Sequence, residues 1–370
     1  MNLQIETGNM DAFFQAPFNA YGADSPYVSP LKSDLARFVD PAQNPLFTQG
    51  GSEIEIFTVH RDGRPIGRIT AHDHRASNNL HDLKRGYFGY FDCSDDPETA
   101  TALLQAAEGW SRKRGYSEIM GNFNLTAMQQ IGVVTDGFEA PPYTDQMWNA
   151  PHIPRLLEAN GYASAFPMTT FDLDLTRAEP PPLGPKQQTI LDDPDFTFAP
   201  ITRRNLKQRM EQARGLLNAA FADNPMFVPV SAEEFHFQAK DMVWIIDKRI
   251  SAMLMYKNEP VATILCVPDL NPFLRRIGSK PGLSTPWHFL RHKLTCRRAV
   301  LIFAAVRPDL QGRGVNPVVM RHVIMALQKA GYHSVGNTWI ADVNPASLAQ
   351  REKAGARTQH RLHMFHKALT

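Results

Sequence analysis

Two glycines, Gly312 and Gly314, follow an apolar segment and precede a stretch with helical periodicity. Backbone N–H groups in such a loop can converge on one ligand, and the helix that follows directs the positive end of its dipole toward the same point. A pyrophosphate is the kind of anion that this arrangement favours. The segment Gln311-Gly312-Arg313-Gly314-Val315-Asn316 lacks the third glycine of a dinucleotide fingerprint and the Gly-Lys-Ser/Thr of a P-loop. As a bare pattern it is equally typical of an ordinary connection between a strand and a helix.

The segments on both sides of the loop predict a strand and a helix that would hold it. The apolar, β-branched run over 299–306 predicts a strand buried on both faces, and Pro308 ends it. Asn316 is a suitable N-cap, Pro317 suits the first helical position, and Gly331 lies where a helix should end. Between them apolar residues recur at helical spacing: Val319, Val323, Leu327 and Ala330.

Length and composition indicate a globular protein of two domains. The chain has 370 residues, 43% of them hydrophobic, and a formal net charge of +2, which gives no reason to expect nucleic-acid binding. Its three cysteines suit a reducing compartment and predict neither a disulfide framework nor a metal site. The N-terminus is acidic rather than signal-like, and no apolar run reaches 18 residues. We therefore expect a cytoplasmic protein without a metal ion.

Short segments that occur in the same order in the two halves indicate an internal duplication. The proline-rich segment 177–195 predicts a linker between a domain over 1–176 and a domain over 196–370. The segment Lys113-Arg114-Gly115-Tyr116 corresponds to Lys329-Ala330-Gly331-Tyr332, and Gly161-Tyr162-Ala163 corresponds to Gly355-Ala356-Arg357. Local insertions over 125–150 and 268–290 explain why the offset between the halves changes.

The loop and its setting resemble the acyl-CoA site of the GNAT acyltransferase superfamily. Gln311 and Gly314 match the family's Gln/Arg-x-x-Gly-x-Gly/Ala pattern, and Val306-Arg307-Pro308 matches the end of the preceding strand, whereas Asn316 departs from the final small residue. The whole chain resembles bacterial tandem-GNAT proteins, among which are bacterial ceramide synthases. Segments that carry this likeness include Gly86-Tyr87-Phe88-Gly89-Tyr90-Phe91-Asp92-Cys93 and Asp136-Gly137-Phe138. The resemblance implies an α/β fold of two GNAT-like domains in tandem, each a mixed, mostly antiparallel sheet flanked by helices.

The resemblance also implies which residues would contact the donor. Backbone N–H groups near Ala304, Ala305 and Val306 would polarise the thioester carbonyl, and the loop residues Gln311, Gly312, Arg313, Gly314, Val315 and Asn316 would hold the pyrophosphate. Asn344 and Ser347 correspond to residues that touch the CoA arm, although Asn344 is equally well explained as a helix N-cap before Pro345.

The sequence gives fewer indications of which residues would act as the general acid and the general base. Relatives often carry a tyrosine in the last helix to protonate the leaving thiolate, and Arg351 occupies that position here. Arginine can stabilise a thiolate but is not a proton donor near neutral pH. Asp342 is our candidate for the group that receives the amine proton, with a solvated turn aspartate as the competing interpretation.

The first half should not bind CoA in the same way. In place of the glycine-rich loop it has Ser94-Asp95-Asp96-Pro97-Glu98, and carboxylates at a helix N-terminus repel a phosphate. We therefore expect a degenerate first domain and an acyl-CoA-binding second domain.

A basic segment from Arg275 to Arg298 holds seven Lys/Arg and no acid, with Trp287, Phe289 and Leu290 among them. It is typical of a solvated face, and it also suits contact with CoA phosphates or peripheral docking on an anionic inner-membrane face.

The function predicted from these observations is transfer of a long acyl chain from CoA to a primary amine, with a sphingoid-type base as one acceptor and sphingolipid biosynthesis as one setting. Three alternatives stay open: a short-chain acetyltransferase acting on a small polar amine, an aminoacyl-tRNA-dependent transferase, and a non-catalytic acyl-CoA sensor. The acceptor and the oligomeric state do not follow from the sequence.

Overall fold

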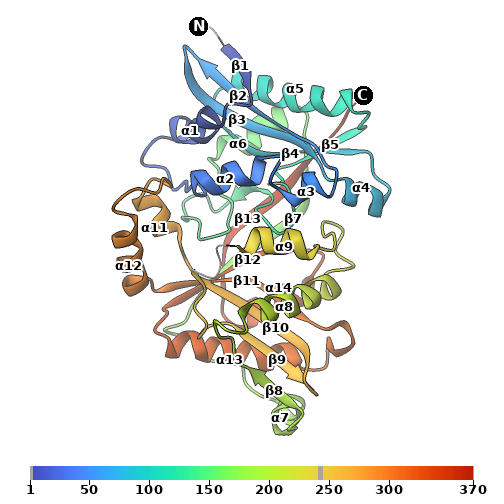
Figure 1. Ribbon diagram of the computed structural model, residues 1–370, viewed down its shortest axis with the longest axis vertical. Helices are drawn as coiled ribbons and strands as arrows, with labels where there is room; N and C mark the ends of the chain where they lie inside the picture. The colour runs from blue at the N-terminus through green and yellow to red at the C-terminus, as the bar shows by residue number, and fades with distance from the viewer. Residues whose placement is uncertain (1–2, 241–244, 370) are drawn as a thin grey trace. The chain divides into compact units, whose positions relative to one another are not determined.

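The computed structural model describes residues 3–240 and 245–369 and divides into two compact units. The first unit comprises Met1–Thr169, Asn271–Phe289 and Gln359–Thr370, and the second comprises Thr170–Leu270 and Leu290–Thr358. Figure 1 labels the helices and strands along the chain.

The first unit is a mixed sheet with helices on both faces. Its strands are β1 (Leu3–Thr7), β2 (Ile54–Arg61), β3 (Arg64–Asp73), β4 (Arg85–Cys93), β5 (Glu118–Gly121), β6 (Val133–Asp136) and β13 (Arg357–Ala368). They follow the order β1-β2-β3-β4-β5-β13, with β6 also pairing β13, and β4–β5 is a parallel pair. The helices are α1 (Met10–Tyr21), α2 (Lys32–Val39), α3 (Pro45–Thr48), α4 (Arg75–His81), α5 (Pro97–Lys113), α6 (His152–Ala159) and α11 (Asn271–Arg276).

Alternating strand residues of the first unit supply two cores. Val59 and Ile69 pack with Leu103 and Leu104 of α5, whereas Ile56 packs with Phe13 and Phe14 of α1. Because successive strand side chains point to opposite faces, α5 and α1 cover opposite sides of the sheet (Figure 1).

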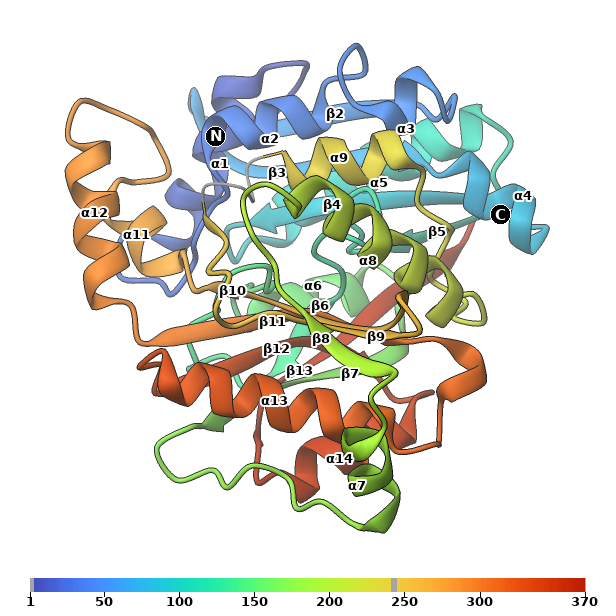
Figure 2. The same ribbon diagram turned by 60° about the horizontal axis from the view of Figure 1, so that its bottom comes forward.

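The second unit repeats this plan. Its strands are the last part of β7 (Ala163–Asp174), from Thr170 on, together with β8 (Phe196–Ala199), β9 (Ala252–Tyr256), β10 (Glu259–Pro268), β11 (Arg298–Val306) and β12 (Ser334–Ala341), in the order β7-β12-β11-β10-β9-β8. Its helices are α7 (Pro185–Asp192), α8 (Leu206–Ala220), α9 (Ala232–Ala239), α13 (Val315–Lys329) and α14 (Pro345–Lys353), while α12 (Thr285–Thr295) crosses the boundary between the units. In Figure 2, α13 runs along one side of β9–β12 and α8 along the other.

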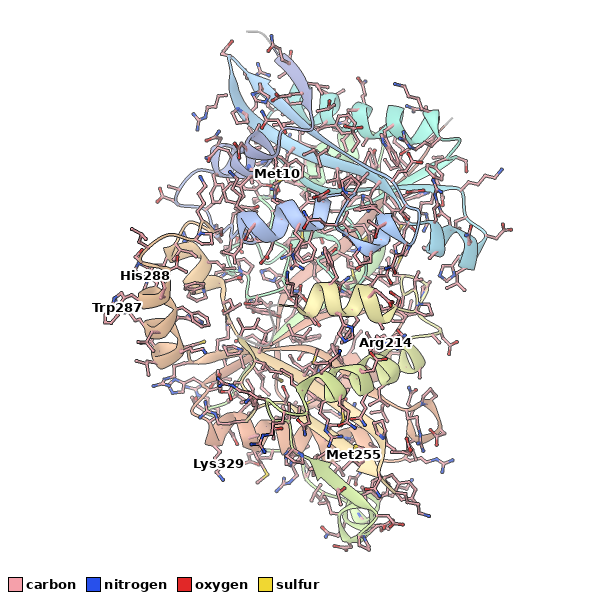
Figure 3. All side chains as sticks on the ribbon, in the orientation of Figure 1. Met10, Arg214, Met255, Trp287, His288 and Lys329 are labelled. Atoms are coloured by element: carbon pink, nitrogen blue, oxygen red, sulfur yellow. The ribbon has the colours of Figure 1, made fainter. Side chains whose placement is uncertain are left out.

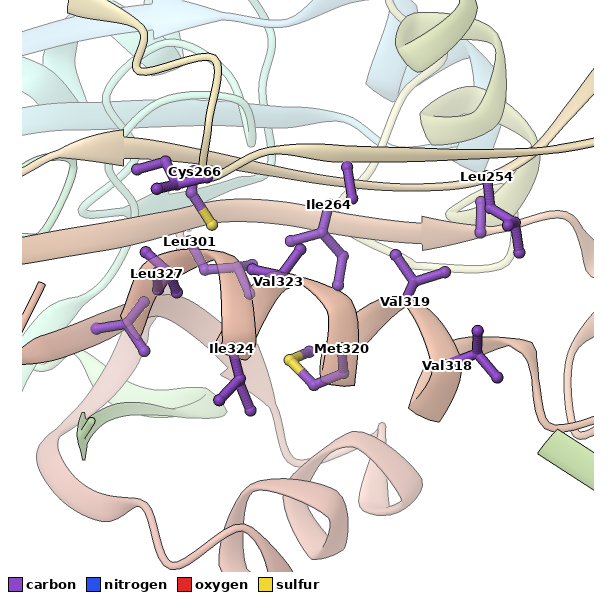
Figure 4. Packing of buried hydrophobic residues seen from close by; sticks show 14 of the residues in the cluster. Leu254, Ile264, Cys266, Leu301, Val318, Val319, Met320, Val323, Ile324 and Leu327 are labelled. Carbon is purple, nitrogen blue, oxygen red and sulfur yellow. The ribbon is translucent and has the colours of Figure 1, made fainter. Parts of the chain in front are cut away.

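The apolar stripe of α13 explains why this helix stays against the sheet. Val319, Val323 and Leu327 are buried with strand residues Leu254, Ile264 and Leu301 (Figure 4). Burying such side chains contributes roughly 1.5–3 kcal/mol each. The strand and helix predicted around the glycine-rich loop are therefore confirmed, since β11 spans Arg298–Val306 and α13 ends just before Gly331, which has φ +86°.

One prediction about α13 is wrong. The N-cap is Gly314, in a left-handed conformation with φ +92°, and the helix begins at Val315 rather than at Pro317. Asn316 lies inside the first turn, where its side-chain amide donates to Gln350 Oε1 of α14 at 2.7 Å. The helix starts earlier because glycine reaches a positive φ without steric cost and so can turn the chain directly into the helix.

The two units correspond element by element, as the duplication predicts. Strands β2-β3-β4-β5 and β9-β10-β11-β12 have the same order, and in each set the last two strands form a parallel pair. The connecting helix is α5 in one unit and α13 in the other. The mixed, mostly antiparallel sheets flanked by helices confirm the predicted fold class.

The compact units differ from the expected ranges at three places. Residues 271–289 and 359–370 belong to the first unit, and residues 170–176 belong to the second. The strand that closes each half of the chain, β7 or β13, thus contributes its terminal part to the other unit. Leu173 and Leu175 of the first half are buried in the core of the second unit.

The expected linker is ordered and attached to α13. Arg321 Nη1 donates to the carbonyls of Pro180 and Pro181, at 3.2 and 2.9 Å, and Gln328 Nε2 donates to those of Leu175 and Ala178, both at 2.9 Å. Helix α7 (Pro185–Asp192) lies within the expected linker range, and its Ile190 is buried in the core of the second unit.

Candidate active site

A β-bulge in β11 opens the centre of the second unit's sheet. In the ladder with β10, Leu265 faces Phe303 and Cys266 faces Leu301, so Ile302 is the extra residue. The parallel ladder with β12 runs from Arg298↔Ser334 to Leu301↔Asn337 and ends at the same point. Thr338 Oγ1 then donates to the Ile302 carbonyl at 2.7 Å. A bulge bends the strand that carries it, and β11 and β12 separate beyond this residue.

The bulge determines where the next N–H groups point. Arg307 N–H donates to Val261 O of β10 at 2.8 Å, so residues 303, 305 and 307 direct their N–H groups toward β10. Because N–H groups alternate along a strand, those of Ala304 and Val306 point away from β10, toward the side where the ladder with β12 has already ended. These two residues present backbone donors in the opening between β11 and β12, and Ala305 does not.

The glycine-rich loop adjoins this opening. Gln311 Nε2 donates to the Val306 carbonyl at 3.1 Å, which fixes the loop to the end of β11. Gly312 and Gly314 have φ +70° and +92°, and no side chain caps α13. The first N–H groups of a 15-residue helix are thereby left for another acceptor, and an anion is the group that they favour.

Helix α7 lies beside the loop, which the sequence did not indicate. A Cβ placed on Gly314 would be 3.0 Å from Gln187 Nε2 and 3.7 Å from Ile190 Cδ1. At Gly312 nothing lies within 4 Å of that position. The loop therefore has one side covered by α7 at Gly314 and an open side at Gly312.

The remaining predicted residues cluster on and before α14. Asn344 is the N-cap of α14 and accepts from Ser347 N–H at 3.1 Å. The interpretation of Asn344 as a helix N-cap is therefore correct, and its proposed contact with the CoA arm stays a prediction. Asp342 is half-buried in the turn directly after β12.

Arg351 is a buried residue on α14. Its Nη1 lies 3.5 Å from Met320 Sδ of α13, and its charge acts on Cys266, whose pKa burial raises to about 12. The guanidinium therefore lies in the interior of the second unit, close to the helix that follows the glycine-rich loop.

In the first unit, the equivalent opening is filled by the protein's own side chains. Between Arg68↔Asp92 and Thr70↔Gly89 the ladder of β3 and β4 is bulged, and Tyr90 has φ +49°. Here Tyr90 N–H donates to Asn124 Oδ1 at 2.7 Å, and Phe91 N–H donates to Asn122 Oδ1 at 3.1 Å. Both asparagines are buried.

The helix that follows in the first unit is also capped. Asp96 is the N-cap of α5 and accepts from Thr99 N–H at 3.1 Å, while Arg61 bonds both Asp96 and Glu98. The donors that remain available in the second unit are thus already occupied in the first.

A small polar cavity in the first unit was not predicted. The buried pair Arg68–Asp92, with Nη2 to Oδ2 at 2.7 Å, lines it together with Tyr27, Gln146 and Trp148. Asp145, beside Gln146, has φ +66°, and burial raises the pKa of its carboxyl to about 7. The only sequence signal was the length of the loop over 125–150.

Three histidines that could be considered as metal ligands have contacts within the protein instead. His74 accepts from Ser77 N–H as the cap of α4, His72 stacks on Tyr87, and His366 pairs with Glu118. Over residues 3–240 and 245–369, no group of three or more His, Cys, Asp or Glu is arranged to hold a metal ion. None of the helices in these ranges is long and apolar enough to cross a membrane.

Comparison with known proteins shows the fold. No family model matches the chain. It is 24% identical over 369 residues to a protein named bacterial ceramide synthase from Caulobacter vibrioides, covering 96% of this chain and 94% of that one. It is 25% identical over 382 residues to Protein YghO of Escherichia coli, covering 99% and 94%.

Solved structures match the chain over its whole length, and two of them illustrate the likeness. One is a tandem GNAT protein from the clavulanic acid biosynthesis pathway, with TM-score 0.60, 11% identity and coverage of 100% of this chain and 99% of the other. The second is a GCN5-related N-acetyltransferase from Sphaerobacter thermophilus, with TM-score 0.57, 13% identity and coverage of 99% and 96%. The predicted tandem-GNAT fold is confirmed.

Proposed function

We propose that this chain is an acyl-CoA-dependent N-acyltransferase whose second unit binds the donor. The observation that carries the proposal is the combination, in one unit, of an uncapped glycine-rich helix start and two backbone donors in the opening beyond the bulge at Ile302. The first supports pyrophosphate binding and the second supports polarisation of a thioester carbonyl.

The reaction needs a neutral amine that attacks the carbonyl carbon, and the C–S bond then breaks to release the CoA thiolate. In the proposed mechanism the N–H groups of Ala304 and Val306 stabilise the negative charge that develops on the carbonyl oxygen. Asp342 takes the amine proton, through water, and the Arg351 guanidinium stabilises the leaving thiolate without donating a proton. Gln311, Gly312, Arg313, Gly314, Val315 and Asn316 form the pyrophosphate site, and Asn344 and Ser347 contact the CoA arm.

The first unit is inactive toward the donor in this proposal. Asn122 and Asn124 occupy the equivalent strand donors, and Asp96 places a carboxylate on the equivalent helix. Each of these features removes one requirement for binding and activating an acyl-CoA.

For the substrates, we propose a long-chain acyl-CoA and an amine of the sphingoid type. Support comes from the relative named bacterial ceramide synthase, which matches over nearly the whole chain, and from the apolar run of β11, which has no polar side chain between Arg298 and Arg307. A second candidate is acetyl transfer, because solved proteins with this fold are named N-acetyltransferases.

Release of free CoA thiol tests the proposal. Purified protein is mixed with palmitoyl-CoA or acetyl-CoA and with either a long-chain 2-amino-1,3-diol or a small polar amine. We expect amine-dependent thiol release that is faster with palmitoyl-CoA. Faster release with acetyl-CoA would favour the second candidate, and CoA binding without release by any pair would identify a sensor.

A further inference from the structure

Helix α12 and the residue two positions before it carry an apolar stripe exposed to solvent. Leu283, Trp287, Leu290 and Leu294 are 105%, 67%, 52% and 69% exposed. Their spacing of four, three and four residues places those within Thr285–Thr295 on one side of the helix. Figure 3 shows the Trp287 side chain directed away from the ribbon. Solvent-facing Trp and Leu at helical spacing are a feature of interaction surfaces.

The stripe is not the packing face of α12. Phe289 packs on Phe273 of α11, with ring centroids 5.4 Å apart, and His292 is buried. At about 100° per residue these two lie on the side opposite Trp287 and Leu294. The helix is therefore anchored by one face, and its second apolar face points outward.

The basic residues around the exposed face of α12 indicate which kind of surface that face would bind. The segment from Arg275 to Arg298 carries seven Lys/Arg and no acid. Arg291 and Lys293, both exposed, lie on either side of the stripe by the same helical geometry. Long basic side chains beside an apolar stripe can place their stems in an apolar layer and their charged groups at anionic headgroups. A second copy of this chain would instead bring the same positive charge into the contact.

We propose that α12 docks the protein on an anionic membrane surface, with the helix in the plane of the headgroups and Leu283, Trp287, Leu290 and Leu294 below it. This inference rests on α12 and its charges, and it is independent of acyl transfer. The anionic ligand that we propose is a lipid bilayer and not free phosphate, because only a bilayer also offers an apolar layer in which the apolar stripe can be buried.

Flotation with vesicles tests the proposal. Full-length protein is mixed with vesicles of phosphatidylcholine containing 30% phosphatidylglycerol, as the stated probe, or with pure phosphatidylcholine, at low and high salt. We expect flotation with the anionic vesicles at low salt and much less in the other conditions. The double variant Leu290→Ser/Leu294→Ser should lower the partition coefficient by about a hundredfold or more, since two apolar side chains leave the apolar layer. Arg291→Ala should lower it about fivefold, the equivalent of about 1 kcal/mol for one basic residue.

Matched variants separate docking from a general loss of apolar or basic surface. Leu80→Ser removes an apolar side chain of similar exposure on α4, and Lys113→Ala removes an exposed lysine on α5. Both should float like the unaltered protein, and circular dichroism checks that every variant is folded. Equal flotation of the Leu290/Leu294 variant would overturn the proposal, as would absence of flotation at low salt. Dimers in light scattering that dissociate in this variant, without vesicle binding, would overturn it in favour of self-association.

Discussion

At the scale of single residues, the two units differ in what satisfies the same backbone donors. Asn122 and Asn124 accept from Phe91 and Tyr90 in the first unit, at 3.1 and 2.7 Å. In the second unit Ala304 and Val306 follow the corresponding bulge. An N–H that already has a buried acceptor gains little from a ligand carbonyl, whereas one without an acceptor gains a full hydrogen bond. The chemistry proposed for the second unit depends on this difference.

Gly312 offers a residue-scale test of the pyrophosphate site. Nothing lies within 4 Å of a Cβ at this position, so Gly312→Asn and Gly312→Asp impose the same backbone strain and differ in charge. We expect Gly312→Asp to bind CoA about tenfold or more weakly than Gly312→Asn, because the carboxylate repels the pyrophosphate. Calorimetric titration measures both. Equal affinities would show that the pyrophosphate lies elsewhere.

Asp145 gives a pH-dependent prediction. Burial raises the pKa of this carboxyl from 3.8 to about 7, so the folded protein binds the proton more tightly than the unfolded chain does. Stability attributable to the protonated carboxyl is complete below about pH 4 and is lost as pH rises to about 7. Asp145→Asn, which fits the same space and tolerates φ +66°, should therefore unfold at a higher temperature than the unaltered protein at pH 8.

The size of the Asp145 effect follows from its partial exposure. Water still reaches part of this half-buried residue, and we expect a gain of about 1–2 kcal/mol at pH 8 rather than the full value of the shift. Near pH 4 the two proteins should have the same unfolding midpoint. A gain of equal size at both pH values would contradict the assignment.

At the scale of elements, the sequence was most informative where local signals and packing agree. The apolar run before Pro308 and the 3.6-residue periodicity after Gly314 were enough to locate β11 and α13, because both elements use those same residues in the core. The N-cap was misplaced because Asn316 is a good cap in isolation, whereas the tertiary structure uses it to bond Gln350. The bulge at Ile302 has no local signal, since it arises from the registers of two neighbouring strands.

The linker is a second case in which local signals were insufficient. The prolines of residues 177–195 predict an extended segment, but Pro185–Asp192 form α7, so only residues 177–184 and 193–195 lack helix and strand. The sequence did not reveal how the linker is attached, because three hydrogen bonds from Arg321 and Gln328 reach it from residues about 140–150 positions away.

Proteolysis tests this attachment. Replacing Arg321 with Met and Gln328 with Leu should expose the segment around Arg177 and Lys186 to trypsin, because cleavage follows the population of the opened segment. Each hydrogen bond lost should raise that population about fivefold, for a net contribution of about 1 kcal/mol. Lys329→Met, an exposed neighbour on the same helix, is the control. Unchanged cleavage in the double variant would mean that the hydrogen bonds do not hold the segment.

At the scale of the whole molecule, duplication and divergence together account for the fold and the proposed division of roles. Both units have the same strand order, a parallel pair in the same place and a connecting helix in the same place. The final strands, β7 and β13, each end in the unit built mainly from the other half of the chain. Neither half of the sequence therefore corresponds to a complete unit, and we expect residues 1–176 and 196–370 expressed alone to be less stable than the full chain.

The number of CoA molecules bound per chain tests the central claim most directly. The second unit has an uncapped helix start at Gly314, whereas Asp96 caps the equivalent helix of the first unit. Calorimetric titration of the full chain with CoA should therefore give one site, and Gly312→Asp should remove it. Two sites per chain, or one site that Gly312→Asp leaves unchanged, would contradict the assignment of the donor to the second unit.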